Sequence, residues 1–242
     1  MSTIAGLLSL GRSAIIAEQA AVQTIGQNIA NAETPGYSRQ QVVMNPLPPE
    51  RTGMGILGTG VTISNVLRTR EVLLDQAFRT QTAPAEGAKT RSGLLGSIEG
   101  IFGEPSSSGL ASTLDAFWNA WSDLAANPTN ATAKTVVQQR GAAVVSTFNR
   151  YAKQLDDLST STIAGIPDTL AGANRLTSQI AVLNGQIVAS EAGGMSANDL
   201  RDERDRLIDQ LGKIVPVTVI DRADGSDQVN IGGMPVVDGA DF

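Results

Sequence analysis

Apolar side chains recur at seven-residue intervals along the start of the chain, and this repeat most constrains what the segment can fold into. The repeat and its neighbouring stripe are formed by Ile4, Leu8, Ile15, Val22, Ile25 and Ile29. Such spacing is typical of one face of an amphipathic helix. We therefore expect a single helix over residues 4–31, roughly 40 Å long. Gly11 and Glu18 interrupt the second stripe, so the pattern indicates a helix more strongly than a coiled coil.

Three glycines inside this segment weaken the expected helix. Gly6, Gly11 and Gly26 each cost about 1 kcal/mol relative to alanine in a helix interior, and isolated helices of this length are already marginal in water. We therefore expect the helix to need a partner surface against which its apolar side chains pack. The pattern leaves open the alternative of an ordinary core helix in a globular domain.

A short segment after the helix has the residues of a helix end and a tight turn. Its characteristic residues are Asn28, Asn31, Thr34, Pro35, Gly36 and Tyr37. Proline presets φ at the first central position of a type II turn, and glycine supplies the positive φ that the second position requires. We therefore predict a type II turn with a positive φ at Gly36.

Residues 36–70 are predicted to be an extended linker. Its prolines prevent a helix, and the alternation from Val61 to Val66 predicts a short strand. The glycines of this stretch are Gly53, Gly55, Gly58 and Gly60. Because no Gly-Lys-Ser/Thr follows them, they do not form a phosphate-binding loop of the usual kind.

Helical patterning dominates residues 71–212. The clearest seam lies over residues 131–161, where two stripes are both filled, which favours antiparallel helical packing. These stripes contain Val137, Val144, Tyr151 and Leu158, and then Phe148 and Leu155.

Both tryptophans of the chain lie in the preceding helical segment. Neighbouring helix positions are about 100° apart, so Phe117 and Trp118 cannot share one narrow face. We predict that Phe117 and Trp121 are buried, together with Leu114 and Leu124, and that Trp118 is the more exposed aromatic side chain.

A highly charged helix is predicted near the end of the block, from Leu200 to Leu211. Ser196 and Asp199 have the spacing of a capping box at its start. Its carboxylates alternate with arginines, a pattern typical of a solvated helix face with weak ion pairs. The carboxylates are Asp199, Asp202, Glu203, Asp205 and Asp209.

The fold class that follows is mainly α. We expect a long N-terminal axial helix, a short extended linker, an elongated antiparallel helical bundle and the start of a β-rich region. The corresponding segments are residues 1–35, 36–70, 71–212 and 213–242. In the last of them, alternating valines flank Asp224-Gly225, which predicts a β-hairpin.

Composition removes several classes of function. The chain contains no cysteine and no histidine, so thiolate chemistry and the commonest general base and metal ligand are missing. A net charge of −6 argues against nucleic acid and anionic membrane surfaces as partners. We expect no catalytic residue, no cofactor and no metal site, although all-carboxylate and Ser–Lys mechanisms stay formally open.

One segment carries a family resemblance. The run from Gln23 to Tyr37, QTIGQNIANAETPGY, resembles the N-terminal signature that flagellar rod, hook and hook-associated proteins share. Three further features are similar to the hook-associated protein 1 family: the continuation of the turn through Gln40, the long helical block, and the segment from Asn198 to Asp205 with the strands after it. We call residues 28–37 the signature turn.

The resemblance implies a non-enzymatic structural subunit at the hook–filament junction. Its implied partners are copies of itself, the hook protein, a second junction protein, the flagellar export apparatus and a cytoplasmic export chaperone. Secretion to the extracellular flagellum is implied too. Family members are longer and carry a C-terminal helix that pairs with the N-terminal one, so this sequence is expected to be an N-terminal portion.

Two alternatives stay open at this point. A distal rod or hook subunit would share the signature turn but would turn mainly to β structure after residue 70. A secreted cell-wall hydrolase carried on an axial N-terminus would instead need a deep pocket with two convergent carboxylates.

Overall fold

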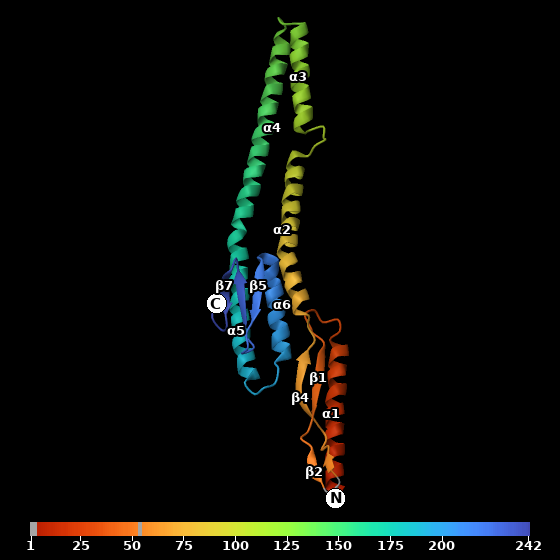
Figure 1. Cartoon of the computed structure of the whole chain (residues 1–242). Coiled ribbons are helices and arrows are strands. Elements are labelled where there is room, and N and C mark those ends of the chain that lie inside the picture. The colour runs from red at the N-terminus through yellow and green to blue at the C-terminus, as the bar shows by residue number, and fades with distance from the viewer. Residues whose placement is uncertain (1–3, 53–54) are drawn as a thin grey trace. The chain divides into compact units, whose positions relative to one another are not determined.

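The computed structural model describes residues 4–52 and 55–242 (Figure 1). The chain divides into two compact units, one formed by Met1–Pro84 with Gly172–Phe242 and the other by Ala85–Ala171. Gly53, one of the linker glycines, lies outside the described residues, as do the first three residues of the predicted axial segment.

Helices hold most of the described residues, so the predicted mainly α fold is confirmed. The helices are α1 (Ile4–Ala30), α2 (Val72–Phe102), α3 (Leu110–Ala126), α4 (Ala131–Ala164), α5 (Ile166–Glu191) and α6 (Asn198–Ile214). The strands are β1 (Gln40–Pro46), β2 (Glu50–Thr52), β3 (Gly55–Leu57), β4 (Val61–Arg68), β5 (Val217–Asp221), β6 (Asp227–Ile231) and β7 (Met234–Asp238). The predicted division into four domains stays a prediction.

The unit Ala85–Ala171 contains the antiparallel pair α3–α4 (Figure 1). Val137 and Tyr151 of the predicted seam are buried, and Val144 and Leu158 are half-buried, so this seam faces inward as expected. The second stripe is only partly right, because Phe148 is 52% exposed.

The aromatic residues of α3 correct one prediction. Trp118 is 63% exposed and is the more exposed tryptophan, as predicted, but Trp121 is also exposed, at 46%. The buried residue of this face is Ala120, so the inward line of α3 runs through Phe117 and Ala120 and leaves Trp121 beside it. Phe117 is half-buried, and a Cβ at Gly141 of α4 would lie 3.4 Å from its ring.

A compact core lies in the other unit, where α5 and α6 pack on the antiparallel sheet β5-β6-β7. Its fully buried side chains include Ile180, Ile187, Ile208, Leu211, Val229 and Val237. The predicted hairpin is confirmed: β5 pairs with β6, and the turn between them contains Gly225 at φ +88°. This core fixes α6 in place, and α6 carries much of the site described below.

Helix α1 contacts the two-stranded ribbon β1–β4 with its small residues. The residues on the covered face are Ser13, Ala17, Ala20, Thr24 and Asn28. Short side chains allow this close approach: a Cβ at Gly60 would fall 2.3 Å from Ser13 Oγ. The bulky apolar stripe therefore points away from the ribbon. The ordinary core helix considered above is wrong for the described residues.

The interior glycines of α1 give the first testable prediction. A Cβ at Gly11 or Gly26 meets no atom within 4 Å, so alanine fits there without a clash. Each replacement should stabilise the helix by about 1 kcal/mol. Amide hydrogen exchange on the Gly11→Ala/Gly26→Ala variant should show slower exchange across α1. Unchanged exchange would mean that neighbouring contacts, and not glycine, limit the stability of α1.

Candidate functional site

Asn28 organises the signature turn at the end of α1. Its Oδ1 accepts hydrogen bonds from the Tyr37 hydroxyl and the Gln40 N–H, both at 2.9 Å, and its Nδ2 donates to Gln40 O at 2.8 Å. The Asn28 side chain therefore connects the last turn of α1 to Tyr37, at the end of the signature turn, and to Gln40, the first residue of β1.

The turn itself has the predicted geometry. Gly36 adopts φ +87°, and the Tyr37 N–H donates to Thr34 O at 3.2 Å, as expected for a type II turn with Pro35 and Gly36 at its centre. The Thr34 hydroxyl donates to Asn31 Oδ1, whose Nδ2 donates to Gln27 O. The predicted turn residues therefore form one hydrogen-bonded unit, and their functional role stays a prediction.

The chain just after this turn contacts α6. The Ser38 N–H donates to Asp202 Oδ2 at 2.9 Å, and both residues are buried. Gln40 Nε2 donates to Asp199 Oδ1 at 3.2 Å. The turn and α6 also line a recess of about 330 Å³. In the C-terminal half of the chain, α6 is thus the helix against which the signature turn and the residues after it lie.

One face of α6 carries a row of carboxylates that binds arginines from the start of the chain. We call Asp202, Asp205 and Asp209 the α6 carboxylate row. Arg68 Nη1 lies 2.7 Å from Asp202 Oδ1 and 2.8 Å from Asp205 Oδ2. Arg79 bridges Asp205 at 3.2 Å and Asp209 at 2.7 Å.

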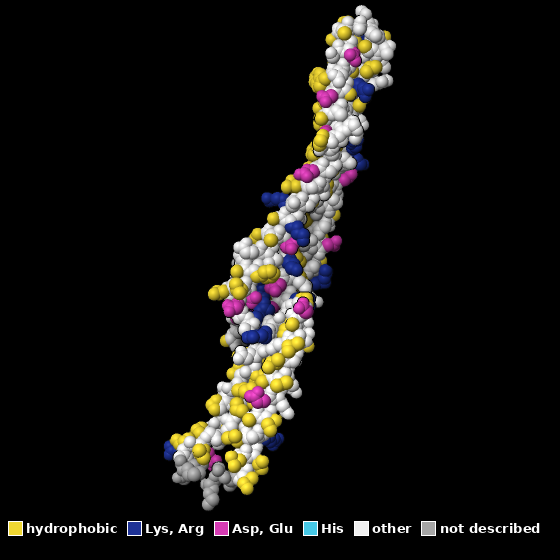
Figure 2. All heavy atoms as spheres, turned by 90° about the vertical axis from the view of Figure 1, so that its right-hand side faces the viewer, with side chains coloured by type: hydrophobic (Ala, Val, Ile, Leu, Met, Phe, Trp, Pro, Cys, Tyr) yellow, Lys and Arg dark blue, Asp and Glu magenta, His cyan; other side chains and the backbone are white. Residues whose placement is uncertain are grey.

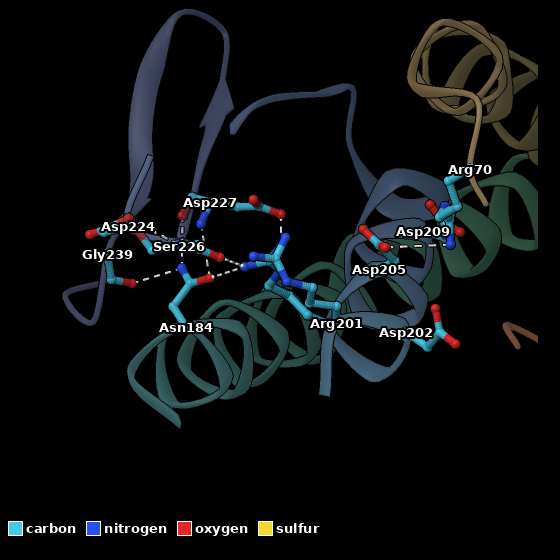
Figure 3. Close-up of polar contacts among 12 residues, drawn as sticks. Arg70, Asn184, Arg201, Asp202, Asp205, Asp209, Asp224, Ser226, Asp227 and Gly239 are labelled. Atoms are coloured by element: carbon cyan, nitrogen blue, oxygen red, sulfur yellow. Dashed lines mark hydrogen bonds and ion pairs between the residues drawn. The ribbon is translucent and has the colours of Figure 1, made fainter. Parts of the chain in front are cut away.

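This arrangement contradicts the prediction of a solvated charged face. Asp202 and Asp205 are buried, because the arginines that pair with them arrive from β4 and α2, more than 120 residues earlier in the chain. Arg70 completes the cluster, 3.4 Å from Asp205 (Figure 3), and is also paired with Asp75. The i, i+3, i+7 spacing of the carboxylates was the sequence signal that could have identified one face.

The capping box prediction is also wrong. No side chain caps α6 at Ala197. Asn65 of β4 instead accepts the Ser196 N–H at 3.1 Å and donates to the Ser196 hydroxyl, while Glu191 accepts the Ala197 N–H at 2.9 Å. The distant Asn65 and the nearby Glu191 bind the backbone before α6 in place of a capping box, so Ser196 also serves to hold β4 against α6.

Electrostatics favour the charged form of Asp205. Burial by itself would raise the pKa of this carboxyl group, but the guanidinium groups of Arg68, Arg70 and Arg79 outweigh it and lower the pKa below its usual value. Asp205 is therefore ionised at neutral pH and available as an anchor for all three arginines.

The lowered pKa of Asp205 predicts how stability depends on pH. A carboxyl group with a depressed pKa in the folded state contributes stability above its unfolded pKa, about 3.9, and loses it as the pH falls through the folded value. The difference in unfolding free energy between wild type and Asp205→Asn should therefore narrow as the pH falls below about 4. Urea titrations of both proteins at several pH values between neutral and acid measure this difference in unfolding free energy. A difference that does not change with pH would contradict this electrostatic account.

A second polar cluster lies inside the core behind α6 (Figure 3). Arg204 Nε is 2.9 Å from Asp227 Oδ2, and both side chains are almost fully buried. This Nε makes no well-aligned hydrogen bond, so the contact is a charge pair. Arg204 Nη1 donates to Asn184 Oδ1 and to Gly225 O.

Asn184 completes this cluster with all of its hydrogen-bonding capacity used. Its Nδ2 donates to Asp227 O and Gly239 O, and its Oδ1 also accepts the Asp227 N–H. Burial raises the pKa of Asp227 to about 7, against the attraction of Arg204. Every group points at another protein group, so the cluster holds the β5–β6 turn on α5 and α6.

The predicted axial stripe of α1 is exposed. All six of its residues, Ile4, Leu8, Ile15, Val22, Ile25 and Ile29, are more than half exposed. Figure 2, in which the side that carries α1 faces the viewer, shows hydrophobic side chains gathered over it. Contiguous apolar surface of this kind is typical of a protein–protein contact.

Two kinds of site are missing from the described part of the chain. Its carboxylates nowhere form a group of three that could hold a metal ion. Within the same residues, every helix is too short or too polar to cross a bilayer.

Family models match the chain in two places. Residues 8–37 match the flagella basal body rod protein family, and residues 95–242 match the helical domain of flagellar hook-associated protein FlgK. The first match covers α1 and the signature turn, and the second covers α6 and the core around it.

Individual proteins agree with these matches. Flagellar hook-associated protein 1 of Bacillus subtilis is 37% identical over 90% of this chain and 44% of its own length. The protein of that name from Salmonella typhimurium is 29% identical over 89% of this chain and 39% of its own length. The chain thus spans less than half the length of these relatives.

A solved structure shows the same fold. The flagellar hook junction protein FlgK from Burkholderia pseudomallei superimposes with a TM-score of 0.62 at 24% identity, covering 68% of this chain and 29% of that one. Since the matched helical domain spans more than half of the sequence, this chain belongs to the flagellar hook-associated protein FlgK family.

Proposed function

We propose that this chain is part of a structural subunit that joins the flagellar hook to the filament and acts by packing against neighbouring subunits. The exposed apolar stripe of α1 carries this proposal. Burying apolar surface contributes about 25 cal/mol per Å², so such a stripe drives association once a complementary surface is available. The relatives named hook-associated protein 1 support the place of assembly.

The partners follow from this role. Copies of the same subunit, the hook protein and the second junction protein would surround the apolar stripe and the signature turn. The extracellular location implies passage through the flagellar export apparatus, assisted by a cytoplasmic chaperone. The absence of cysteine is compatible with that route, since no disulfide has to form after export.

Packing, and not catalysis, is the proposed mode of action. A hydrolase would need carboxylates that converge on an open pocket and are free to exchange protons. The carboxylates of the α6 row are instead bound by arginines at 2.7–3.2 Å. The rod and hook alternatives are less favoured, because the chain after residue 70 is mainly helical.

Electron microscopy of labelled flagella tests the location. Because residues 1–242 contain no cysteine, a cysteine at exposed Asp157 in the native gene adds one site for thiol-directed gold to this part of the subunit. We expect gold only where hook and filament meet, and none on flagella of the unmodified strain. Gold distributed along the hook, or found in the rod, would support the alternative subunits instead.

A further inference from the structure

We propose that Asp202 is a positioning residue that fixes the direction of α1 relative to α6. The inference rests on the proposed function only for its consequence in assembly. The geometry is independent of that function, because it concerns contacts within a single chain.

The contacts of Asp202 lie at the end of the β1–β4 ribbon where β1 begins and β4 ends. Its Oδ2 accepts the Ser38 N–H at 2.9 Å, and its Oδ1 lies 2.7 Å from Arg68 Nη1. Gln40 and Arg68 are direct partners in the ribbon. One carboxylate therefore binds β4 and the backbone two residues before β1, at the end of the ribbon nearest the signature turn.

Helix α1 is attached to Gln40, the ribbon partner of Arg68. Asn28, in its last turn, accepts the Gln40 N–H and donates to the Gln40 carbonyl. The path from α1 to α6 thus runs through Asn28, Gln40, Arg68 and Asp202. Asn28 is hydrogen-bonded to Gln40, Gln40 is paired with Arg68 in the ribbon, and Arg68 forms an ion pair with Asp202. The Arg68–Asp202 contact joins two ionised groups, and such bonds are stronger than neutral ones.

Other contacts hold the ribbon to α6 without fixing its angle. Asn65 binds Ser196, and Asn198 Nδ2 donates to Val66 O at 2.7 Å. These two contacts involve adjacent residues of β4, so they form a pivot. Nearer the signature turn, Gln40 also donates to Asp199 and Arg68 also pairs with Asp205. Asp202 adds the attachment at Ser38 and a second bond to Arg68, and these bonds restrict rotation about the pivot. Loss of Asp202 should therefore leave the chain folded and loosen the direction of α1.

Distance measurements on the purified chain test this inference. Spin labels at Gln23→Cys and Lys213→Cys, both exposed positions on α1 and α6, report the helix direction without background from native cysteines. We expect one narrow distance distribution in the wild type and a distribution at least twice as broad in Asp202→Ala. A reference pair at Asn174 and Lys213, on α5 and α6, should give the same distance distribution in the wild type and in Asp202→Ala.

Asp209→Asn is the matched control. Asp209 belongs to the same carboxylate row, but it pairs with Arg79 of α2 and not with the backbone next to the signature turn. Its α1–α6 distance distribution should stay narrow. Equal broadening in both variants would show a general loosening of the ion cluster, and an unchanged distribution in Asp202→Ala would also overturn the proposal.

Amide exchange supplies a second readout that a purely stabilising role would not move. Protection of the Ser38 N–H should fall by roughly tenfold to a hundredfold in Asp202→Ala, the range expected for loss of a hydrogen bond to a charged group, while amides of α5 keep their protection. If Asp202→Ala fails to fold, Asp202→Asn, which keeps an acceptor but loses the charge, should show an intermediate effect. Uniform loss of protection in that variant would refute a positioning role.

The consequence for assembly is tested separately. In the native gene, Asp202→Ala should reduce filament number while Asp209→Asn does not. If gold labelling places the wild-type subunit elsewhere, the proposed function fails although the distance result stands. If the label lies at the junction and Asp202→Ala assembles normally, the consequence of positioning for assembly is refuted, and the proposed function stands.

Discussion

Replacing Ile15 and Val22 with asparagine should abolish filament growth without unfolding the subunit. These side chains are 61% and 66% exposed in the single chain, and asparagine has nearly the helix propensity of isoleucine and valine. Fully burying an Ile or Val side chain contributes about 1.5–3 kcal/mol. Two losses per subunit, about 3–6 kcal/mol, correspond to a factor of roughly 10² to 10⁴ in association.

Gln19→Asn with Gln23→Asn is the matched control. Both glutamines are exposed positions of α1, so the same number of asparagines is introduced into the same helix outside the apolar stripe. We expect normal filaments from this control, by electron microscopy and swimming assays, and unchanged circular dichroism from both variants. Normal filaments from Ile15→Asn/Val22→Asn would remove the stripe from the assembly interface.

Arg204→Met should lower the free energy of unfolding by about 3–5 kcal/mol, the cost of breaking a buried ion pair by removing one partner. Asp227 would be left buried without its cation, and Asn184 and Gly225 would lose a donor. The methionine fills most of the volume, so the loss reports on charge and hydrogen bonding. Equilibrium unfolding in urea at neutral pH measures it.

Arg206→Met, two residues further along α6, is the control for this prediction. Arg206 forms an ion pair with Glu203, but its side chain is 41% exposed. Exposed pairs contribute about 0–1 kcal/mol, so this variant should unfold close to the wild type. A loss below about 1 kcal/mol in Arg204→Met would mean that Asp227 is accommodated as a neutral acid.

The sequence was most informative where neighbours in the chain decide the structure. The seven-residue repeat predicted α1, and Pro35-Gly36 predicted the turn with its positive φ. These features depend on helix periodicity and on the allowed backbone angles of two residues. Both are local, so they can be read from the segment itself.

Predictions failed where a distant segment supplies the partner. The alternating charges of α6 are typical of a solvated face, and nothing near Asp205 indicates that Arg68 and Arg79 arrive to bury it. The local pattern Ser196 to Asp199 indicated a capping box, but Ser196 is bound by Asn65, 131 residues earlier. The prediction that Trp121 is buried was wrong, because its neighbour Ala120 is the residue of α3 that is buried there.

The long separation between the partners of α6 has a consequence for the order in which the chain folds. The Ser38–Asp202 and Arg68–Asp202 contacts span 164 and 134 residues, and closing a loop of that length costs on the order of 4 kcal/mol in chain entropy. The unit Ala85–Ala171 is continuous in sequence and closes through short connections. In a chain that emerges N-terminus first, the α3–α4 hairpin can therefore form early. The contacts that hold α1 and its ribbon to α6 can form only after α6 has emerged.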